Sequence, residues 1–366
     1  MTGTIDTADC IVVGGGLIGM LGARALAREG LSVILLEQDR LCRESSWAGG
    51  GIISPLVPWA YPDAINELVR WSQSRYPQLA DELLADTGID PEWTQSGLLL
   101  LDCPVDDTVS AWHERFPCRL DALAAGQVQQ AEPGIAAVTG PAVLLPDVAQ
   151  IRNPRLGRAL AAALPLAGVS VHEETCVTGL QIQADVVQGV LTGQGAFTAP
   201  RVVIAGGAWS GRILASVVPG VPVEPVLGQM IMFEASPGLL RHIIVHDGYY
   251  LIPRRDGLVL AGSTVEHTGF SKHITPVARA LLEERAVKIL PALADCPIAG
   301  HWSGLRPGVT GDIPLIGAVR GIDGLFLSAG HYRNGVGMAP ASARLLVDAV
   351  LGRESFTDPG PYRPPG

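Results

Sequence analysis

Three glycines, Gly14, Gly16 and Gly19, stand between two apolar runs, and the second of these runs ends on Glu37. This spacing is typical of a dinucleotide-binding turn. In such a turn Gly14 permits the tight bend, Gly16 lets the backbone approach a pyrophosphate, and Gly19 lets a helix pack closely on a strand. The carboxylate of Glu37 can accept hydrogen bonds from both ribose hydroxyls and would repel a 2′-phosphate. The pattern therefore predicts a dinucleotide site.

The elements that must hold this site follow from the apolar pattern. Residues 10–13 are a continuous apolar run, as in a parallel strand that is covered on both faces, and residues 32–36 are expected to form the second strand. Residues 17–29, which lie between the two strands, are expected to form a helix that ends at Gly30. The first N–H groups of this helix would point at the phosphates. Strand, glycines, helix, strand and acid thus fall in the order that the turn requires.

A stretch rich in small residues follows Glu37. A segment of small residues can lay its backbone against a flat ligand, because the side chains allow close approach. A flexible surface loop is the alternative for this segment taken alone. The residues concerned are Ser45, Ser46, Trp47, Ala48, Gly49, Gly50 and Gly51.

Two C-terminal stretches carry arginines among glycines. Arg306 stands in a predicted loop bounded by glycine and proline. Arg333 lies in a second glycine turn, residues 330–337, which follows an apolar strand at 325–329 and opens a helix that reaches about Val350. The N-terminus of that helix would again face an electron-rich group.

The middle of the chain predicts a discontinuous nucleotide domain. A further apolar strand, residues 201–205, runs into two glycines far from the first unit, so we expect the chain to return to the same sheet. Strand-like runs dominate residues 222–262 and predict a mainly antiparallel sheet. We expect two helices within residues 62–86, interrupted at Pro77, a helix over 121–131 and disorder over 358–366.

Composition limits the function classes. A chain of 366 residues is longer than one hydrophobic core usually holds, so two domains are expected. A formal charge of −10 without clustered Lys and Arg argues against a nucleic-acid surface. The six cysteines have no metal-ligand spacing and predict reduced thiols in a cytoplasmic protein. We also expect no signal peptide and no membrane-spanning segment.

Taken together, these motifs resemble the FAD-dependent D-amino-acid oxidase family, and most closely its glycine oxidase branch, over nearly the whole chain. The resemblance implies an α/β fold: a Rossmann-like FAD-binding domain of the glutathione-reductase type, with a second α+β substrate domain built on an antiparallel sheet. The FAD-binding domain is then expected to be discontinuous. Its segments would be residues 1–88, 141–220 and 300–366, and residues 89–140 and 221–299 would form the substrate-binding domain.

The resemblance also implies site residues. Tyr250, Arg306 and Arg333 match positions that bind the substrate carboxylate, and an arginine fork suits that group. Tyr249 would replace Tyr250 if the strand register slipped by one residue. His331 would contact the flavin through its backbone, and no catalytic acid or base is required. By position, the residues that would hold FAD are Gly14, Gly16, Leu17, Ile18, Gly19, Glu37, Gln38, Ser45, Ser46, Gly49, Gly50, Gly51, Val177, His331, Tyr332, Arg333, Asn334, Gly335, Val336 and Gly337.

The implied reaction is FAD-dependent oxidative deamination of glycine, sarcosine or small D-amino acids. Hydride transfer from Cα to the flavin gives an imine, which hydrolyses to a keto acid and ammonia, and O2 is reduced to H2O2. Val265 and Gly248 are expected to leave the substrate pocket roomy.

The resemblance further implies a role in thiazole formation for thiamine, with a homo-oligomer and transient contact with a thiazole synthase. Two alternatives stay open: a dehydrogenase that uses another electron acceptor, and a non-catalytic FAD-binding assembly protein.

Overall fold

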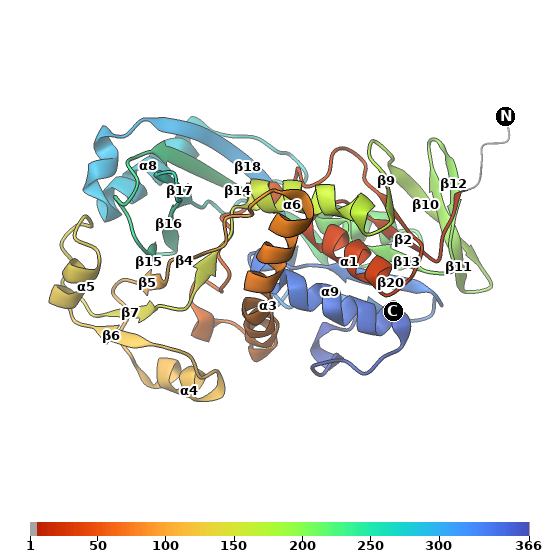
Figure 1. Cartoon of the computed structure of the whole chain (residues 1–366), viewed down its shortest axis with the longest axis horizontal. Coiled ribbons are helices and arrows are strands. Elements are labelled where there is room, and N and C mark those ends of the chain that lie inside the picture. The colour runs from red at the N-terminus through yellow and green to blue at the C-terminus, as the bar shows by residue number, and fades with distance from the viewer. Residues whose placement is uncertain (1–5, 366) are drawn as a thin grey trace.

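A computed structural model describes residues 6–365 and contains two main sheets (Figure 1). The six-stranded sheet has the order β19-β20-β13-β2-β3-β9, and all neighbours are parallel except β19 and β20. Its strands are β2 (Cys10–Val13), β3 (Val33–Leu36), β9 (Val169–His172), β13 (Val202–Ile204), β19 (Leu315–Ala318) and β20 (Leu325–Ala329).

Helices cover one face of this sheet. Cys10 and Val12 of β2 pack with apolar residues of the helices, while Ile11 and Val13 point to the opposite core. Successive side chains of a strand alternate between faces, so the continuous apolar run of β2 supplies both cores. The covering helices are α1 (Leu17–Arg28), α3 (Asp63–Thr87), α6 (Asn153–Leu166) and α9 (Gly335–Leu351).

A small four-stranded sheet covers the other face. Val187, Val190 and Phe197 of this small sheet pack on the second core. Its strands, in the order β1-β12-β11-β10, are β1 (Asp6–Thr7), β12 (Gly195–Thr198), β11 (Val186–Thr192) and β10 (Val177–Gln183).

The second main sheet has eight strands in the order β18-β14-β17-β16-β15-β5-β7-β6, and only β5 and β15 pair in parallel. The predicted antiparallel substrate sheet is therefore confirmed. Helix α8 (Pro276–Ile289) packs on it. Its strands are β5 (Leu98–Leu100), β6 (Asp121–Leu123), β7 (Ala142–Leu145), β14 (Val223–Glu234), β15 (Ile243–His246), β16 (Tyr249–Pro253), β17 (Leu258–Gly262) and β18 (Ile298–Val309).

Short elements complete the described chain. Strands β4 (Thr94–Gln95) and β8 (Ala149–Gln150) form a separate pair. The short α-helices are α2 (Ser45–Ala48), α4 (Asp107–Arg115), α5 (Ala125–Ala131) and α7 (Ser210–Leu214). The 3-10 turns are η1 (Pro58–Ala60), η2 (Gly207–Trp209), η3 (Pro291–Asp295) and η4 (Gly360–Tyr362). Among residues 6–365, none of the helices is both long and apolar enough to cross a membrane.

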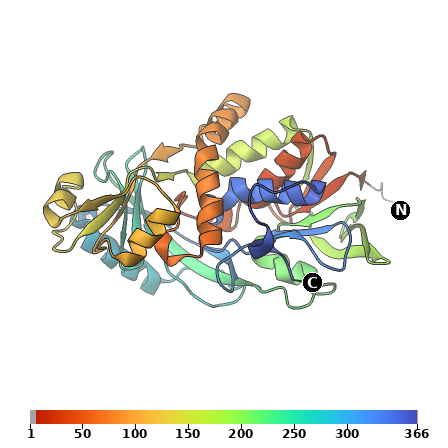
Figure 2. The ribbon, with the colours of Figure 1, turned by 90° about the horizontal axis from the view of Figure 1, so that it is seen from below.

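Three sequence predictions are wrong at the element level. Residues 63–87 form one helix that continues through Pro77, and it stands between the two halves of the molecule (Figure 2). Residues 121–131 contain β6 before α5, because residues 121–123 pair with the distant strand β7. Arg306 lies within β18, opposite Val226, and not in a loop.

The tail was predicted to be disordered, and this is also wrong for residues 358–365. Tyr362 is fully buried, and its hydroxyl donates to the carbonyl of Ala64 at 2.7 Å. Phe356 stacks on Trp71 with 4.8 Å between the ring centres. Packing of these rings under α3 outweighs the flexibility that prolines and glycines suggest. Gly366 and residues 1–5, which belong to the predicted FAD-binding domain, lie outside the described residues, and the domain boundaries stay a prediction.

Candidate functional site

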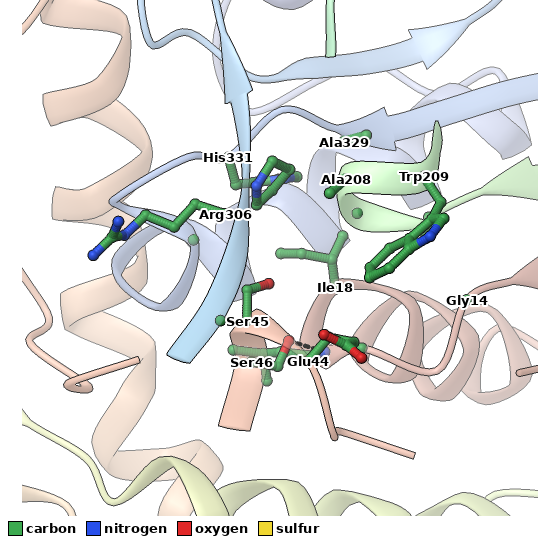
Figure 3. A pocket seen from close by; sticks show the side chains of 18 of the residues that line it. Gly14, Ile18, Glu44, Ser45, Ser46, Ala208, Trp209, Arg306, Ala329 and His331 are labelled. Carbon is green, nitrogen blue, oxygen red and sulfur yellow. Dashed lines mark hydrogen bonds between the residues drawn. The ribbon is translucent and has the colours of Figure 1, made fainter. Parts of the chain in front are cut away.

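One cavity of about 550 Å³ lies where the parallel strands β2, β3, β13 and β20 end, and it continues to the face of the eight-stranded sheet. Ligands of doubly wound α/β folds bind at this edge. Figure 3 shows Arg306 toward one end of the cavity and Trp209 and Gly14 toward the other, with His331 and Ile18 between them.

The cavity collects twenty of the predicted site residues. Gly19 and Gly337 are not on its wall. The predicted residues that line it are Gly14, Gly16, Leu17, Ile18, Glu37, Gln38, Ser45, Ser46, Gly49, Gly50, Gly51, Val177, Tyr250, Arg306, His331, Tyr332, Arg333, Asn334, Gly335 and Val336.

The first glycine turn is as tight as the spacing predicts. Gly14 has a φ of +117°, and a Cβ placed on it would lie 2.4 Å from the carbonyl oxygen of Ala205. A Cβ on Gly19 would lie 1.9 Å from the carbonyl oxygen of Gly14. Gly19 therefore allows α1 to approach the turn, and it contributes to the site without touching the cavity.

The N-terminus of α1 faces the cavity. The backbone N–H of Leu17 donates to Ser46 Oγ at 2.9 Å, as the dashed line in Figure 3 shows. Ser46 thereby joins the small-residue stretch to the turn, and the first turn of α1 contains no acidic residue. The helix end thus remains favourable for an anion such as a pyrophosphate.

Glu37 lies where a ribose acceptor is required. Its carboxylate accepts from the N–H of Gly15 at 2.6 Å and from the N–H of Asp39 at 3.0 Å. Burial raises the pKa of Glu37 above its usual range, although these two backbone hydrogen bonds lower it. Both carboxylate oxygens have a second lone pair, so the group can still accept from hydroxyls of a bound nucleotide.

The small-residue stretch is packed closely from behind. A Cβ on Gly50 would lie 2.5 Å from Cδ1 of Ile252, and a Cβ on Gly51 would lie 1.9 Å from the carbonyl oxygen of Ile151. Arg254, which is buried, donates to the carbonyl of Gly50 at 2.8 Å. The stretch is therefore a fixed wall and not a flexible loop.

Three predicted substrate residues meet at the other end. Tyr250 is buried in β16, and its hydroxyl lies 3.6 Å from the sulfur of Met230. Tyr249 instead packs under Arg285, so the structure places Tyr250 and not Tyr249 at the cavity. Burial lowers the pKa of Arg306, and no carboxylate contributes to this shift. Arg333 is exposed and forms no ion pair within residues 6–365. Two arginines and a tyrosine hydroxyl therefore face one space, and neither arginine forms an ion pair within residues 6–365.

His331 is neutral in the folded chain. It is 2% exposed, and burial lowers its pKa to about 3. Its Nε2 hydrogen-bonds Ser342 Oγ at 3.0 Å within α9. A side chain held in this way is not available as a general base near neutral pH.

Several wall residues were missed from the sequence. The turn after β13, with Ala208 and Trp209, lines the cavity beside the first glycine turn. The sequence pattern of the strand and its two glycines predicts a return to the same sheet, but it does not predict that the following turn lines the site. Gly228 and Ser263 also line the cavity, and no local pattern marks either of them.

The two residues expected to enlarge the substrate pocket do not do so. Gly248 lies in the turn between β15 and β16, with a φ of +77° and open space around it. Val265 is 43% exposed, and neither residue is on the cavity wall. The expectation of a roomier pocket at these positions is therefore wrong.

The cavity fits FAD. Its volume is in the usual range for a small-molecule site, and the first glycine turn and Glu37 line it where a dinucleotide requires a phosphate site and a ribose acceptor. Two wall residues, Asn334 and Ser328, each bury a polar atom that has no partner within residues 6–365. Buried polar atoms normally have partners, and a ligand in this cavity would be able to supply them. Residues of the first turn would hold the dinucleotide end, and the small-residue stretch would hold the ring.

Comparison with known proteins agrees with this arrangement. Residues 9–349 match the family DAO, described as FAD dependent oxidoreductase. The chain is 46% identical over 359 residues to the glycine oxidase of Pseudomonas aeruginosa, covering 97% of this chain and 98% of that protein. It is 31% identical over 355 residues to the bifunctional protein ThiO/ThiG of Trichormus variabilis, covering 95% of this chain and 53% of that protein. The crystal structure of glycine oxidase from Bacillus cereus superposes with a TM-score of 0.88 at 30% identity, covering 95% and 96% of the two chains.

Proposed function

Because this chain belongs to the DAO family of FAD-dependent oxidoreductases, we propose that it oxidises glycine, and that sarcosine and small D-amino acids are further substrates. The family, the FAD cofactor and the fold class expected from the sequence are confirmed. The reaction converts glycine, O2 and water to glyoxylate, ammonia and H2O2. FAD, when bound, supplies the two-electron oxidation and its coupling to O2.

One observation carries the proposal: a dinucleotide cradle and two arginines that form no ion pair within the described chain share a single cavity. Arg306 and Arg333 each offer a planar fork to the glycine carboxylate, and the hydroxyl of Tyr250 adds a third donor. A charge-assisted hydrogen bond contributes about 1.5–3 kcal/mol, so these contacts can orient Cα toward the ring site. The individual site residues are part of the proposal.

His331 does not act as a general base in this reaction. His331 stays neutral and bonded to Ser342, and it lies on the wall between the two ends. Among the described residues, the side chains that shift the pKa of Arg306 are tyrosines and Arg333, and none of them is a histidine or a carboxylate. Glycine that enters as the neutral amine requires no such base.

The test is the visible absorbance of the purified yellow protein under nitrogen. Added glycine is expected to bleach the flavin band, and readmitted air is expected to restore the band with formation of H2O2. Acetate, which has the carboxylate but no amine, is the matched control and should perturb the band without bleaching it. A band that no amino acid bleaches would contradict the proposal, and bleaching without peroxide under air would indicate another electron acceptor.

The product suggests where the enzyme acts. We propose that the imine of glycine feeds thiazole formation for thiamine through contact with a thiazole synthase, and that the enzyme is a homo-oligomer in the cytoplasm. The bifunctional ThiO/ThiG relative supports such a contact because its chain is about twice as long as the shared part. All six cysteines are free, which suits a reducing compartment. Sedimentation of the purified protein tests the oligomeric state.

A further inference from the structure

Arg306 is fixed in place by neutral oxygen atoms. Its Nη2 donates to Ser263 Oγ at 2.8 Å, and its Nη1 donates to the carbonyl of Thr264 at 3.1 Å and to that of Leu227 at 3.4 Å. No ion pair of Arg306 occurs within residues 6–365. The side chain is therefore held on one edge and keeps its whole charge for an incoming anion.

Gly228 supports the same side chain from the neighbouring strand. A Cβ placed on Gly228 would lie 2.1 Å from Nη1 and 2.2 Å from Nη2 of Arg306. The guanidinium thus lies directly against the α-carbon of this glycine. Any side chain at position 228 would push the guanidinium out of its present position.

The support itself is rigid. Thr264 Oγ1 accepts from the backbone N–H of Gln229 at 2.9 Å and donates to Glu266 at 2.6 Å. The backbone groups of Glu266 and Leu227 also bond to each other, with both distances at or below 3.0 Å. Residues 263–266 are therefore held against β14 by hydrogen bonds, and Gly228 belongs to the same strand.

We propose that Ser263 and Gly228 are positioning residues that set the plane of the Arg306 guanidinium for the substrate carboxylate. A planar fork binds a carboxylate through two parallel hydrogen bonds only when its plane matches that of the carboxylate. Ser263 holds Nη2 of Arg306 by a hydrogen bond, and Gly228, which has no side chain, leaves space for the guanidinium group. The inference rests on the proposed function, in which Arg306 binds that carboxylate.

The first test compares Ser263→Ala with Ser263→Thr in the FAD-loaded enzyme. Loss of one hydrogen bond to a charged group is expected to raise the KM for glycine roughly tenfold and to leave kcat within about twofold. Threonine keeps the hydroxyl and should restore most of the lost affinity. Ser271→Ala removes an exposed hydroxyl from the same segment and should change neither constant.

Binding of acetate, followed by the flavin spectrum, separates positioning from a general structural effect. The Kd for acetate should rise by the same factor as the KM in Ser263→Ala. An unchanged KM, or a raised KM with an unchanged acetate Kd, would overturn the inference. If the wild type itself neither binds acetate nor responds to glycine, the proposed function fails instead.

Gly228→Ala provides the second test. The added methyl group overlaps the guanidinium, so kcat/KM for glycine is expected to fall at least about 100-fold while FAD stays bound. Gly126→Ala is the matched control, because a Cβ there meets no other atom within 4 Å. Normal kinetics of Gly228→Ala would contradict the placement of Arg306. The serine variants decide the question if Gly228→Ala does not fold.

Discussion

Arg333 and Arg306 offer the same chemical group in different surroundings. Arg306 is held by three oxygens, whereas Arg333 is exposed and has no hydrogen bond or ion pair in the described part of the chain. An exposed arginine loses more conformational freedom when it binds a ligand. We therefore expect Arg333 to contribute to capture of the carboxylate at the open side and Arg306 to its final orientation.

Arg333→Ala is expected to lower kcat/KM for glycine by roughly 10- to 100-fold, because one charge-assisted contact with the carboxylate is lost. Steady-state peroxide formation measures this effect, and the protein should remain yellow. Arg333→Lys keeps the charge but not the fork and should be intermediate. Arg320→Ala removes another exposed arginine that is not on the cavity wall and should have no effect. Near-normal kinetics of Arg333→Ala would refute the assignment.

His331 predicts a pH dependence of stability. Its folded pKa is about 3, while an unfolded histidine has a pKa near 6.5. The unfolded chain therefore binds the extra proton first, and stability falls as the pH drops below about 6.5. Between pH 6.5 and 4.5 the loss attributable to His331 is about 2 kcal/mol. Urea unfolding with saturating FAD at both pH values measures it.

His331→Gln is the comparison for this prediction, because glutamine can still hydrogen-bond Ser342 and does not titrate. Its stability should fall less than that of the wild type over the same pH range. Equal losses in the two proteins would show that other groups, and not His331, cause the acid sensitivity.

Among individual site residues, the sequence allowed prediction of those that belong to local motifs. Gly14, Glu37 and Arg333 stand in motifs whose spacing has a physical reason. Ser263 and Gly228 were missed because their role depends on the distant Arg306, and only the folded sheet brings the three together. The sequence identified Arg306 as a site residue, but the prediction that it lies in a loop was wrong. Glycines that allow close packing in a strand look the same in a sequence as glycines of a turn.

At the scale of elements, the C-terminal tail is a structural part of the helix layer. Tyr362→Phe removes the hydroxyl that donates to Ala64 and is expected to cost about 1–2 kcal/mol of unfolding free energy. Thermal unfolding of the holoenzyme measures this loss. Arg363→Ala, at an exposed neighbouring position, should stay within about 0.5 kcal/mol of the wild type. If the two variants are equally stable, the tail does not contribute as described.

Element boundaries show where local patterns fail. Pro77 lacks an N–H and disfavours a helix interior by about 3 kcal/mol, yet α3 continues through it. Tyr76 and Leu83, on either side of Pro77, are fully buried in the core of the helix layer, and this packing outweighs the local penalty. The edge strand β6 was missed for the converse reason. It is mostly exposed, so nothing in its composition distinguishes it from a helix turn.

At the scale of the whole molecule, the segment of residues 263–275 connects the two halves. Phe270 packs against Trp209 with ring centres 5.5 Å apart, and Arg212 lies 3.5 Å above its ring. Lys272 forms an ion pair with Glu44 at 2.9 Å. The same segment begins at Ser263, which holds Arg306. Residues 263–275 thus contact both Arg306 and the part of the chain that contains the first glycine turn, through Trp209, Arg212 and Glu44.

The order of strands in the six-stranded sheet determines when this protein can fold during translation. Central strand β2 pairs with β13, which follows about 190 residues later, and β13 in turn pairs with β20. Helix α9 packs on α1 and α3 and is nearly the last element to be made.

A nascent chain therefore leaves the ribosome with β2 unpaired on one edge until more than half of the chain has been synthesised. Such long-range pairing folds slowly and exposes apolar edges. We expect a chain that ends at residue 300 to be digested rapidly by protease even with FAD present, while the full chain resists digestion. A resistant truncated chain would show that the sheet does not need its last strands.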